Sequence, residues 1–234
     1  LIVSRGLGDV YKRQALDSAT TGGSNTAIGY NALTALTTGS QNTAVGQIAL
    51  DAATTASNNT AVGRAALTNA TTGSNNTAVG SGALQENTDA AGNVGVGYLA
   101  LNLNTTGTYN VGVGFKALDA NTTGDYNTGI GNHALGGNTT ANNNTAIGYN
   151  SLKANTTGTA NVAMGANALD ANTTADNNTA IGYNSLTANT TAGSNTAVGA
   201  FTLTSVTTGD QNTAVGRGAL SDNTGSQNTA VGYN

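Results

Sequence analysis

Residues 42–63 read NTAVGQIALDAATTASNNTAVG, so the phrase NTAVG returns 17 residues after its first complete occurrence. The Asn that opens the phrase or a close variant stands at positions 25, 42, 59, 76, 93, 110, 127, 144, 161, 178, 195, 212 and 228. Eleven of the steps between these positions are 17 residues long, and the last is 16. A fixed spacing of this kind is the signature of a repeat protein.

We number the unit positions 1–17 from this Asn, which gives the consensus N-T-A-[IV]-G-x-x-A-L-x-x-N-T-T-G-x-x. The unit is too short for repeats built on helix pairs or propeller blades. β-branched Thr and Val with a following Gly favour a short strand that ends at a corner. In that strand Thr26 and Ile28 point to one face and Ala27 to the other. The sequence therefore predicts an all-β fold, a parallel β-solenoid with one coil per unit, a second short strand around positions 7–10 and a turn at N-T-T-G.

The unit contains few large apolar residues. We expect the aliphatic residues at positions 4 and 9 to form the core with the Ala residues at 3 and 8. Two such side chains cannot offset the entropy lost by 17 ordered residues. We therefore expect ladders of identical residues between coils, including an Asn ladder, and association of chains that buries the Ala and Leu faces. Positions 6, 7, 10, 11, 16 and 17 vary, as residues that face solvent or a ligand do.

The unit resembles a known family of surface proteins. N-T-A-[IV]-G is similar to the repeated phrase in the heads of trimeric autotransporter adhesins, and the full unit is similar to repeats of bacterial surface proteins and phage tail-fibre-like proteins. The resemblance covers residues 15–234 and implies a left-handed parallel β-roll, a homotrimer and a role in attachment. It also implies an extracellular location, either at the bacterial cell surface as a protein anchored in the outer membrane or on a virion tail. The 17-residue period is longer than that of the adhesin heads, and Thr replaces their Val except at Val94, Val111 and Val162.

Residues 1–14 (LIVSRGLGDVYKRQ) match no unit position, whereas Ala15 and Leu16 are already in phase with Ala32 and Leu33. We interpret 1–14 as a non-native, adaptor-derived segment, with a solenoid cap as the alternative, and 15–234 as a repeat region of about 12–13 coils truncated at both ends. This region has four basic and ten acidic residues, which argues against a nucleic-acid partner. No apolar run is long enough to span a membrane.

The sequence offers no catalytic, cofactor-binding or metal-binding constellation. His133 is the only histidine and is expected to be an exposed bystander; Asp119 and Asp125 follow no repeated spacing with it. Scattered acids leave calcium between coils as a minor alternative. The G-x-G fragments at 95–97 and 112–114 lack the context of a phosphate loop. Candidate surface contacts, for a carbohydrate, a host surface or the trimer seam, are the position-6 tyrosines Tyr30, Tyr98, Tyr149, Tyr183 and Tyr233.

Two polar features leave alternatives open. N-T-T at 104–106, 121–123, 138–140, 155–157, 172–174 and 189–191 fits the N-glycosylation pattern, although a turn needs the same residues. Thr rows at positions 2, 13 and 14 would suit an ice-binding face, unless Thr at position 2 faces the core and the others cap turns. The leading expectation is a structural and adhesive rod of a surface adhesin or tail fibre. An ice-binding solenoid is the alternative, and an enzyme is the least favoured.

Overall fold

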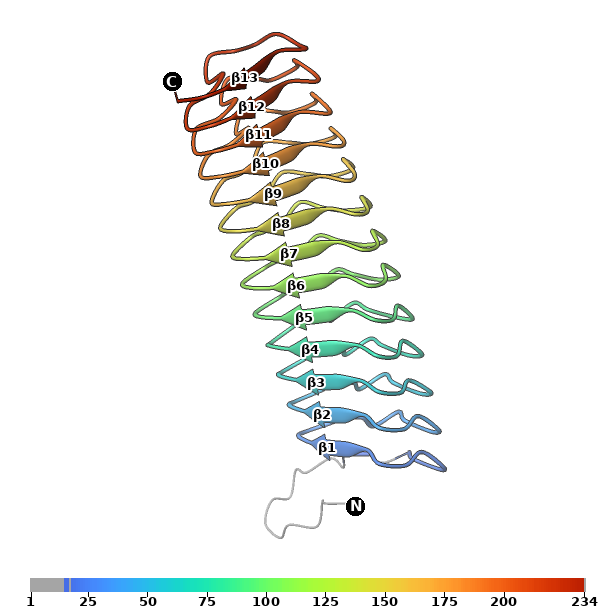
Figure 1. Cartoon of the computed structure of the whole chain (residues 1–234). Coiled ribbons are helices and arrows are strands. Elements are labelled where there is room, and N and C mark those ends of the chain that lie inside the picture. Colours follow the sequence, from blue (N-terminus) through green and yellow to red (C-terminus); the bar gives the residue numbers. More distant parts are fainter. Residues whose placement is uncertain (1–14, 17, 234) are drawn as a thin grey trace.

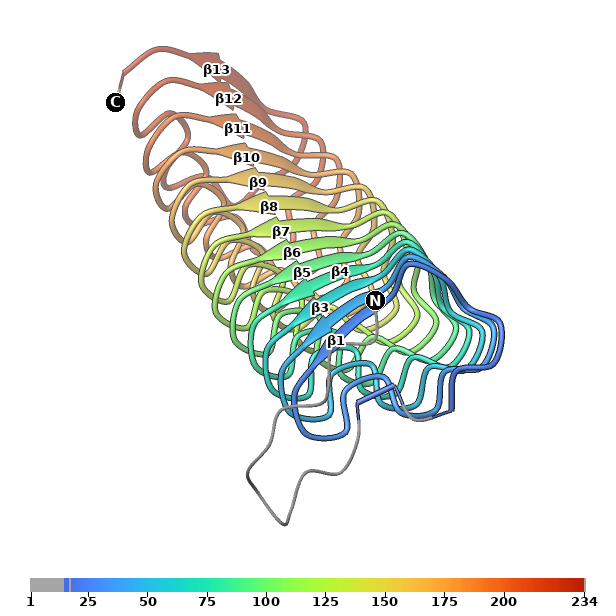
Figure 2. The same ribbon diagram turned by 90° about the horizontal axis from the view of Figure 1, so that it is seen from below.

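The computed structural model describes residues 15, 16 and 18–233, so segment 1–14 lies outside the described residues. The described chain is a stack of coils (Figures 1 and 2), and each repeat unit from Asn25 onward contains one strand of three residues. All neighbouring strands are parallel and pair in chain order, which confirms the predicted β-solenoid with one coil per unit. The strands are β1 (Thr26–Ile28), β2 (Thr43–Val45), β3 (Thr60–Val62), β4 (Thr77–Val79), β5 (Val94–Val96), β6 (Val111–Val113), β7 (Thr128–Ile130), β8 (Thr145–Ile147), β9 (Val162–Met164), β10 (Thr179–Ile181), β11 (Thr196–Val198), β12 (Thr213–Val215) and β13 (Thr229–Val231).

The register places identical unit positions over one another. Val94 pairs with Val111, Gly95 with Gly112 and Val96 with Val113, and the same pattern holds for all twelve strand pairs. The 16-residue last step is absorbed outside the strands, because Thr213 still pairs with Thr229. The chirality of the coil stays a prediction.

Gly at position 5 ends each strand. Gly114 has a φ of 138°, and a Cβ on it would lie 2.4 Å from the carbonyl oxygen of Gly131 in the next coil. Only glycine combines this backbone conformation with so close an approach of two coils. The corner that follows the strand is therefore set by position 5.

The core differs from the expected one. Ala at positions 3 and 8 and Leu at position 9 are buried, whereas the aliphatic residue at position 4 points outward and is partly exposed, as at Val79 and Ile130. The expectation that position 4 belongs to the core is wrong, because alternation along the strand turns position 3 inward. The interior admits little more than a methyl group there: a Cβ on Gly112 would lie 3.1 Å from both Leu101 Cγ and the Ala117 carbonyl oxygen.

The second predicted strand is also wrong. Positions 6–10 form turns, and within them positions 7 and 9 have positive φ, as at Lys116 (52°) and Leu118 (54°). A left-handed residue reverses the chain and cannot continue a strand. The conformation turns Leu118 inward, where it is fully buried, and its N–H donates to the Ala134 carbonyl oxygen at 3.0 Å. Burial of the leucine offsets the unfavourable backbone conformation.

The Asn ladder at position 1 is confirmed. The backbone N–H of Asn110 donates to Asn93 Oδ1 at 2.8 Å, and its own Oδ1 accepts the N–H of Asn127 at 2.8 Å. Its Nδ2 donates to the Gly124 carbonyl oxygen at 2.7 Å. Both the donor and the acceptor of this fully buried side chain are satisfied. Each such Asn therefore links its own coil to the coil before it and to the coil after it.

A second buried Asn ladder occupies position 12 from Asn87 to Asn189. Asn121 Nδ2 donates to Asn104 Oδ1 at 2.7 Å and to the Gly124 carbonyl oxygen at 3.0 Å, the same oxygen that Asn110 reaches. The sequence predicts these residues only as formers of the N-T-T-G turn. They do form that turn, but their side chains lie in the interior, where they donate to backbone carbonyl groups of their own unit.

Side chains at positions 13 and 16 also connect coils. Thr122 Oγ1 donates to the Thr139 carbonyl oxygen at 3.0 Å, and the same pattern recurs along the row. At position 16, the Thr108 N–H donates to Asp125 Oδ1 and the Asp125 N–H to Asn142 Oδ1, both at 2.6 Å. The side chain at position 16 therefore often accepts a hydrogen bond from the coil before it. The sequence analysis predicts only that this position varies freely.

One chain alone buries the residues that were expected to need partners. Ala and Leu at positions 8 and 9 have no exposed surface in coils such as Ala117–Leu118. The reason given for association, burial of the Ala and Leu faces, is therefore wrong, and any association must use the outer surface.

Candidate functional surfaces

The most regular outer surface is formed by the side chains at positions 2 and 4 of the thirteen strands, which we call the sheet face. Position 2 is half-buried or exposed in every strand, as at Thr60 and Thr77. The alternative in which Thr at position 2 faces the core is therefore wrong; by alternation Ala at position 3 takes that place. Thr at position 13 does bond the next coil, and Thr at position 14, such as Thr106 and Thr123, is exposed.

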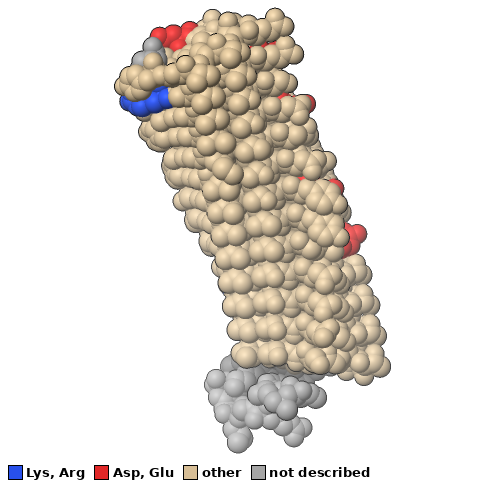
Figure 3. Space-filling model, viewed as in Figure 1, with Lys and Arg blue, Asp and Glu red and all other residues tan. Residues whose placement is uncertain are grey.

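The sheet face contains no charged residue. Its members are Thr, Val, Ile and a single Met, Met164. The surface shown in Figure 3 is likewise nearly free of charged side chains. The solvated face of an antiparallel sheet normally carries polar and charged residues. Here a row of partly exposed aliphatic residues lies beside a row that is mostly Thr, which makes the sheet face a candidate contact surface.

The structure exposes all five predicted tyrosines, to between 42% at Tyr30 and 77% at Tyr233. It does not bring them together. Tyr98 stacks on Phe115 with ring centroids 5.5 Å apart, and Tyr183 meets Phe201 edge to face at 5.3 Å. These contacts run along one chain between adjacent coils.

Sequence reasoning missed a third aromatic pair. Tyr109 and Tyr126, at position 17, stack with centroids 5.4 Å apart and an interplanar angle of 10°, and both are more than half exposed. Their spacing of one unit was the available signal, since residues 17 apart lie in contact in a solenoid. Arg217 lies over the rings of Phe201 and Tyr233 and donates from Nη1 to the Tyr233 hydroxyl at 3.0 Å.

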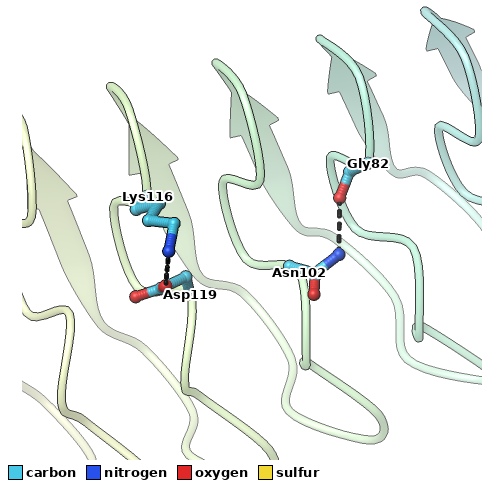
Figure 4. Close-up of polar contacts among 4 residues, drawn as sticks. All are labelled: Gly82, Asn102, Lys116 and Asp119. Carbon is cyan, nitrogen blue, oxygen red and sulfur yellow. Dashed lines mark hydrogen bonds and ion pairs between the residues drawn. The ribbon is translucent and has the colours of Figure 1, made fainter.

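His133 is half-exposed and packs edge-on against Phe115, so it is less of a bystander than expected. Lys116 Nζ lies 3.9 Å from Asp119 Oδ2 (Figure 4), and His133 is close enough to Asp119 to favour its charged form. Burial nevertheless dominates and raises the pKa of Asp119 above its ordinary value. Lys116 and His133 weaken that shift without reversing it.

Within residues 15, 16 and 18–233, no three His, Cys, Asp or Glu side chains gather as metal ligands would. Asp125 and Asp176 instead accept N–H and hydroxyl donors of Thr108 and Thr159. Asn102 Nδ2 similarly donates to the Gly82 carbonyl oxygen at 2.9 Å (Figure 4). Among the described residues, no helix is suited to cross a membrane.

The positions of the six N-T-T asparagines disfavour N-glycosylation of the folded chain. All six are fully buried, and each uses both Nδ2 hydrogens in the position-12 ladder; Asn138, for example, donates to Asn121 Oδ1 and to the Ala141 carbonyl oxygen. The alternative in which N-T-T only builds the turn fits this arrangement.

Comparisons of the chain with protein-family models, with curated proteins and with solved structures return no match.

Proposed function

We propose that the chain is the rod of an extracellular adhesin or tail fibre, in which copies of the chain pack side by side through the sheet face as a homotrimer. The observation that carries the proposal is the uncharged sheet face on a chain whose interior is already complete. The number three rests on the resemblance of the repeat to trimeric adhesin heads and tail-fibre-like proteins.

The form of the sheet face suits a second copy of the same surface. In-register strands place Thr over Thr and aliphatic residue over aliphatic residue at a spacing of about 4.8 Å. The partly exposed row at position 4 runs along the whole stack from Ile28 to Val231. Two or three copies aligned along their axes would cover this row continuously, which gives a contact area that grows with rod length.

The mechanism of such a rod is mechanical. Stacked coils joined by backbone hydrogen bonds and two Asn ladders resist bending. Between the strands β1 to β13 the chain has no long loop, so this part offers few sites for proteolysis. Attachment to a host surface or carbohydrate would use the exposed aromatic residues, such as Tyr98 and Tyr126.

The test is the mass of the repeat region in solution, measured by sedimentation equilibrium, for the wild-type chain and for the V96K/V113K variant. We expect a trimer for the wild type and a monomer with unchanged circular dichroism for the variant, because paired lysines would be desolvated in the seam. The control variant T106K/T123K changes exposed residues of the same two coils outside the sheet face and should remain trimeric. A monomeric wild type, or a trimeric V96K/V113K variant, would contradict the proposal.

A second candidate function, ice binding, is favoured by one observation: Thr at position 2 points outward beside the aliphatic row. Thr60 and Thr77 then belong to a flat, regular T-x-[IV] array. A monomeric chain should in that case show thermal hysteresis, and T60K/T77K should reduce it strongly while T72K, at the exposed position 14, should not. Absence of hysteresis in the monomer rules this candidate out.

A further inference from the structure

The structure separates the asparagines of this chain that match N-x-T into two chemical environments. Eleven asparagines match the pattern. The six at position 12 are buried, and Asn69 is half-buried with its Nδ2 donating to Glu86 Oε2 at 2.7 Å. The remaining four stand at position 17 and are exposed: Asn58, Asn75, Asn143 and Asn177.

The position-12 asparagines cannot carry a sugar in this fold. Asn121 Nδ2 donates to Asn104 Oδ1 and to the Gly124 carbonyl oxygen, and its side chain has no exposed surface. A sugar on Nδ2 would remove one of these hydrogen bonds and require space inside the coil. Modification there and folding are therefore mutually exclusive.

The position-17 asparagines are held only by their backbone. Asn75 N–H donates to the Ser57 carbonyl oxygen at 3.1 Å, and Asn143 N–H donates to the Asp125 carbonyl oxygen at 3.1 Å. Within the described residues, no hydrogen bond involves the side chains of these four asparagines. Their amide groups are thus accessible without any change to the ladders.

The Thr of each N-N-T site faces outward as well. Asn59 and Asn76 point into the core at position 1, so the residues on either side of them, Asn58 with Thr60 and Asn75 with Thr77, point away from it. A transferase that recognises the asparagine amide and the threonine hydroxyl together would find both on the outer surface. The buried N-T-T sites do not offer this combination.

The backbone at position 17 gives asparagine a structural advantage but does not require it. Asn58 and Asn75 have φ values of 59° and 62°, which asparagine tolerates better than most residues. Tyr109, Ala160 and Gln211 adopt the same conformation in other coils. The asparagines are therefore not obligatory for the fold.

We propose that Asn58, Asn75, Asn143 and Asn177 are acceptors for N-linked glycans. A transferase would use a sugar activated as a glycosyl diphosphate. Asparagine Nδ2 forms a bond to the anomeric carbon, the bond from that carbon to the diphosphate oxygen breaks, the diphosphate leaves with the electron pair, and a base of the transferase takes one amide proton.

The position of the acceptors along the rod sets a pattern. Asn58 and Asn75 lie in adjacent coils, about 4.8 Å apart along the axis. Asn143 and Asn177 are two coils apart, with Ala160 between them. The same row carries the stacked Tyr109 and Tyr126 between the two pairs, so glycans would flank a bare aromatic segment.

The experiment treats the folded full chain with a soluble N-glycosyltransferase of N-x-S/T specificity and uridine diphosphate glucose, and locates the added hexoses by fragmentation mass spectrometry. The same chain unfolded in urea, diluted into the reaction, is the comparison. We expect hexose on the four position-17 asparagines of the folded chain at occupancy at least ten times that of the position-12 asparagines. The unfolded chain should accept hexose in both groups.

Matched variants test the assignment. Thr60→Ala should remove hexose from Asn58 alone, whereas Thr60→Ser should retain it, with unchanged thermal melting in both. The V96K/V113K chain should accept hexose on the same four asparagines. Comparison with the wild type shows whether a partner copy shields these asparagines from the transferase. The glycosylation result therefore stays separate from the test of the rod proposal. Equal occupancy of position 12 and position 17 in the folded chain, or no hexose on position 17 in both the wild type and V96K/V113K, would overturn the proposal.

Discussion

At the scale of single residues, hydrogen-bonded asparagine side chains fill a part of the interior that apolar side chains fill in most proteins. The side chain at position 1 must donate to a carbonyl group in its own coil and accept an N–H from the next, as Asn110 does with Gly124 and Asn127. Aspartate would lose the donor and stack carboxylates along the axis. Glutamine carries the same groups on a longer chain that the narrow coil has no room for.

The position-12 ladder ends with an unsatisfied atom. Asn189 Oδ1 is, among the described residues, the buried side-chain atom that has no hydrogen-bond partner, because position 12 of the next coil is Val206. Val206→Asn supplies the missing donor. We expect the variant to raise the free energy of unfolding by about 1 kcal/mol, measured by chemical denaturation.

The control for this change is Ala53→Asn. Ala53 occupies the same position 12, but its neighbours Leu36 and Ala70 are apolar. An asparagine at residue 53 would have no ladder to join and should lower the free energy of unfolding. If both variants have the same effect, continuity of the ladder is not what stabilises the chain.

At the scale of the coil, each element is a strand of three residues between fixed corners. The corner at position 5 is the least tolerant part of the unit. Gly114→Ala would place a methyl carbon 2.4 Å from the Gly131 carbonyl oxygen and impose a φ of 138° on alanine. We expect the variant to lose about 3 kcal/mol or more of stability by thermal or urea unfolding.

Gly23 provides the matched comparison. A Cβ on Gly23 meets nothing within 4 Å, and its φ lies outside the left-handed region. Gly23→Ala should therefore leave the unfolding transition unchanged. A similar loss in both glycine variants would show that added methyl groups, and not the corner, cause the effect.

The sequence predicts the coil well where period alone decides. The 17-residue step places Asn over Asn and Val over Val, so the parallel register and the Asn ladder follow from counting. The sequence does not predict the backbone conformation within one unit correctly. The left-handed conformation at position 9 has no signature in residue type, because leucine does not favour positive φ. At position 7 the recurring Asn and Gly, as at Asn150 and Gly82, were an available signal. The two left-handed positions replace the expected second strand.

The surfaces were harder to predict than the stack for a related reason. Hydrophobicity alone assigns Val79 to the core, but the strand has only one inward position and Ala78 occupies it. Tyr109 and Tyr126 were overlooked because they are separated by a whole unit in sequence. Their contact becomes evident once the coil is known to have a constant length.

At the scale of the whole molecule, the structure is a column in which β1 and β13 lie at opposite ends (Figure 1). Twelve steps of about 4.8 Å give a length of roughly 55–60 Å between these strands. Each coil contacts only its neighbours, so stability is approximately a sum of coil and interface contributions. Removal of one complete unit should then shorten the rod and leave its architecture intact.

Deletion of residues 110–126 tests this directly. Asn93 would be followed in phase by Asn127, and the ladders would close across the junction. We expect an unchanged circular dichroism spectrum, a length shorter by about 4.8 Å in small-angle X-ray scattering, and a melting temperature within a few degrees of the wild type.

Deletion of residues 110–118 is the corresponding control, since it removes half a unit and puts Asn127 out of phase with Asn93. That variant should aggregate or melt at much lower temperature. If the two deletions have the same effect on folding and melting temperature, the stack is not built from independently removable units.

The constant step also has a consequence for heredity. A replication error that inserts or deletes one block of 17 codons would add or remove one whole unit of the chain. Because strands pair in chain order and every block closes on the next, the product of the error still folds. The length of this rod could therefore change by whole coils without passing through a misfolded intermediate.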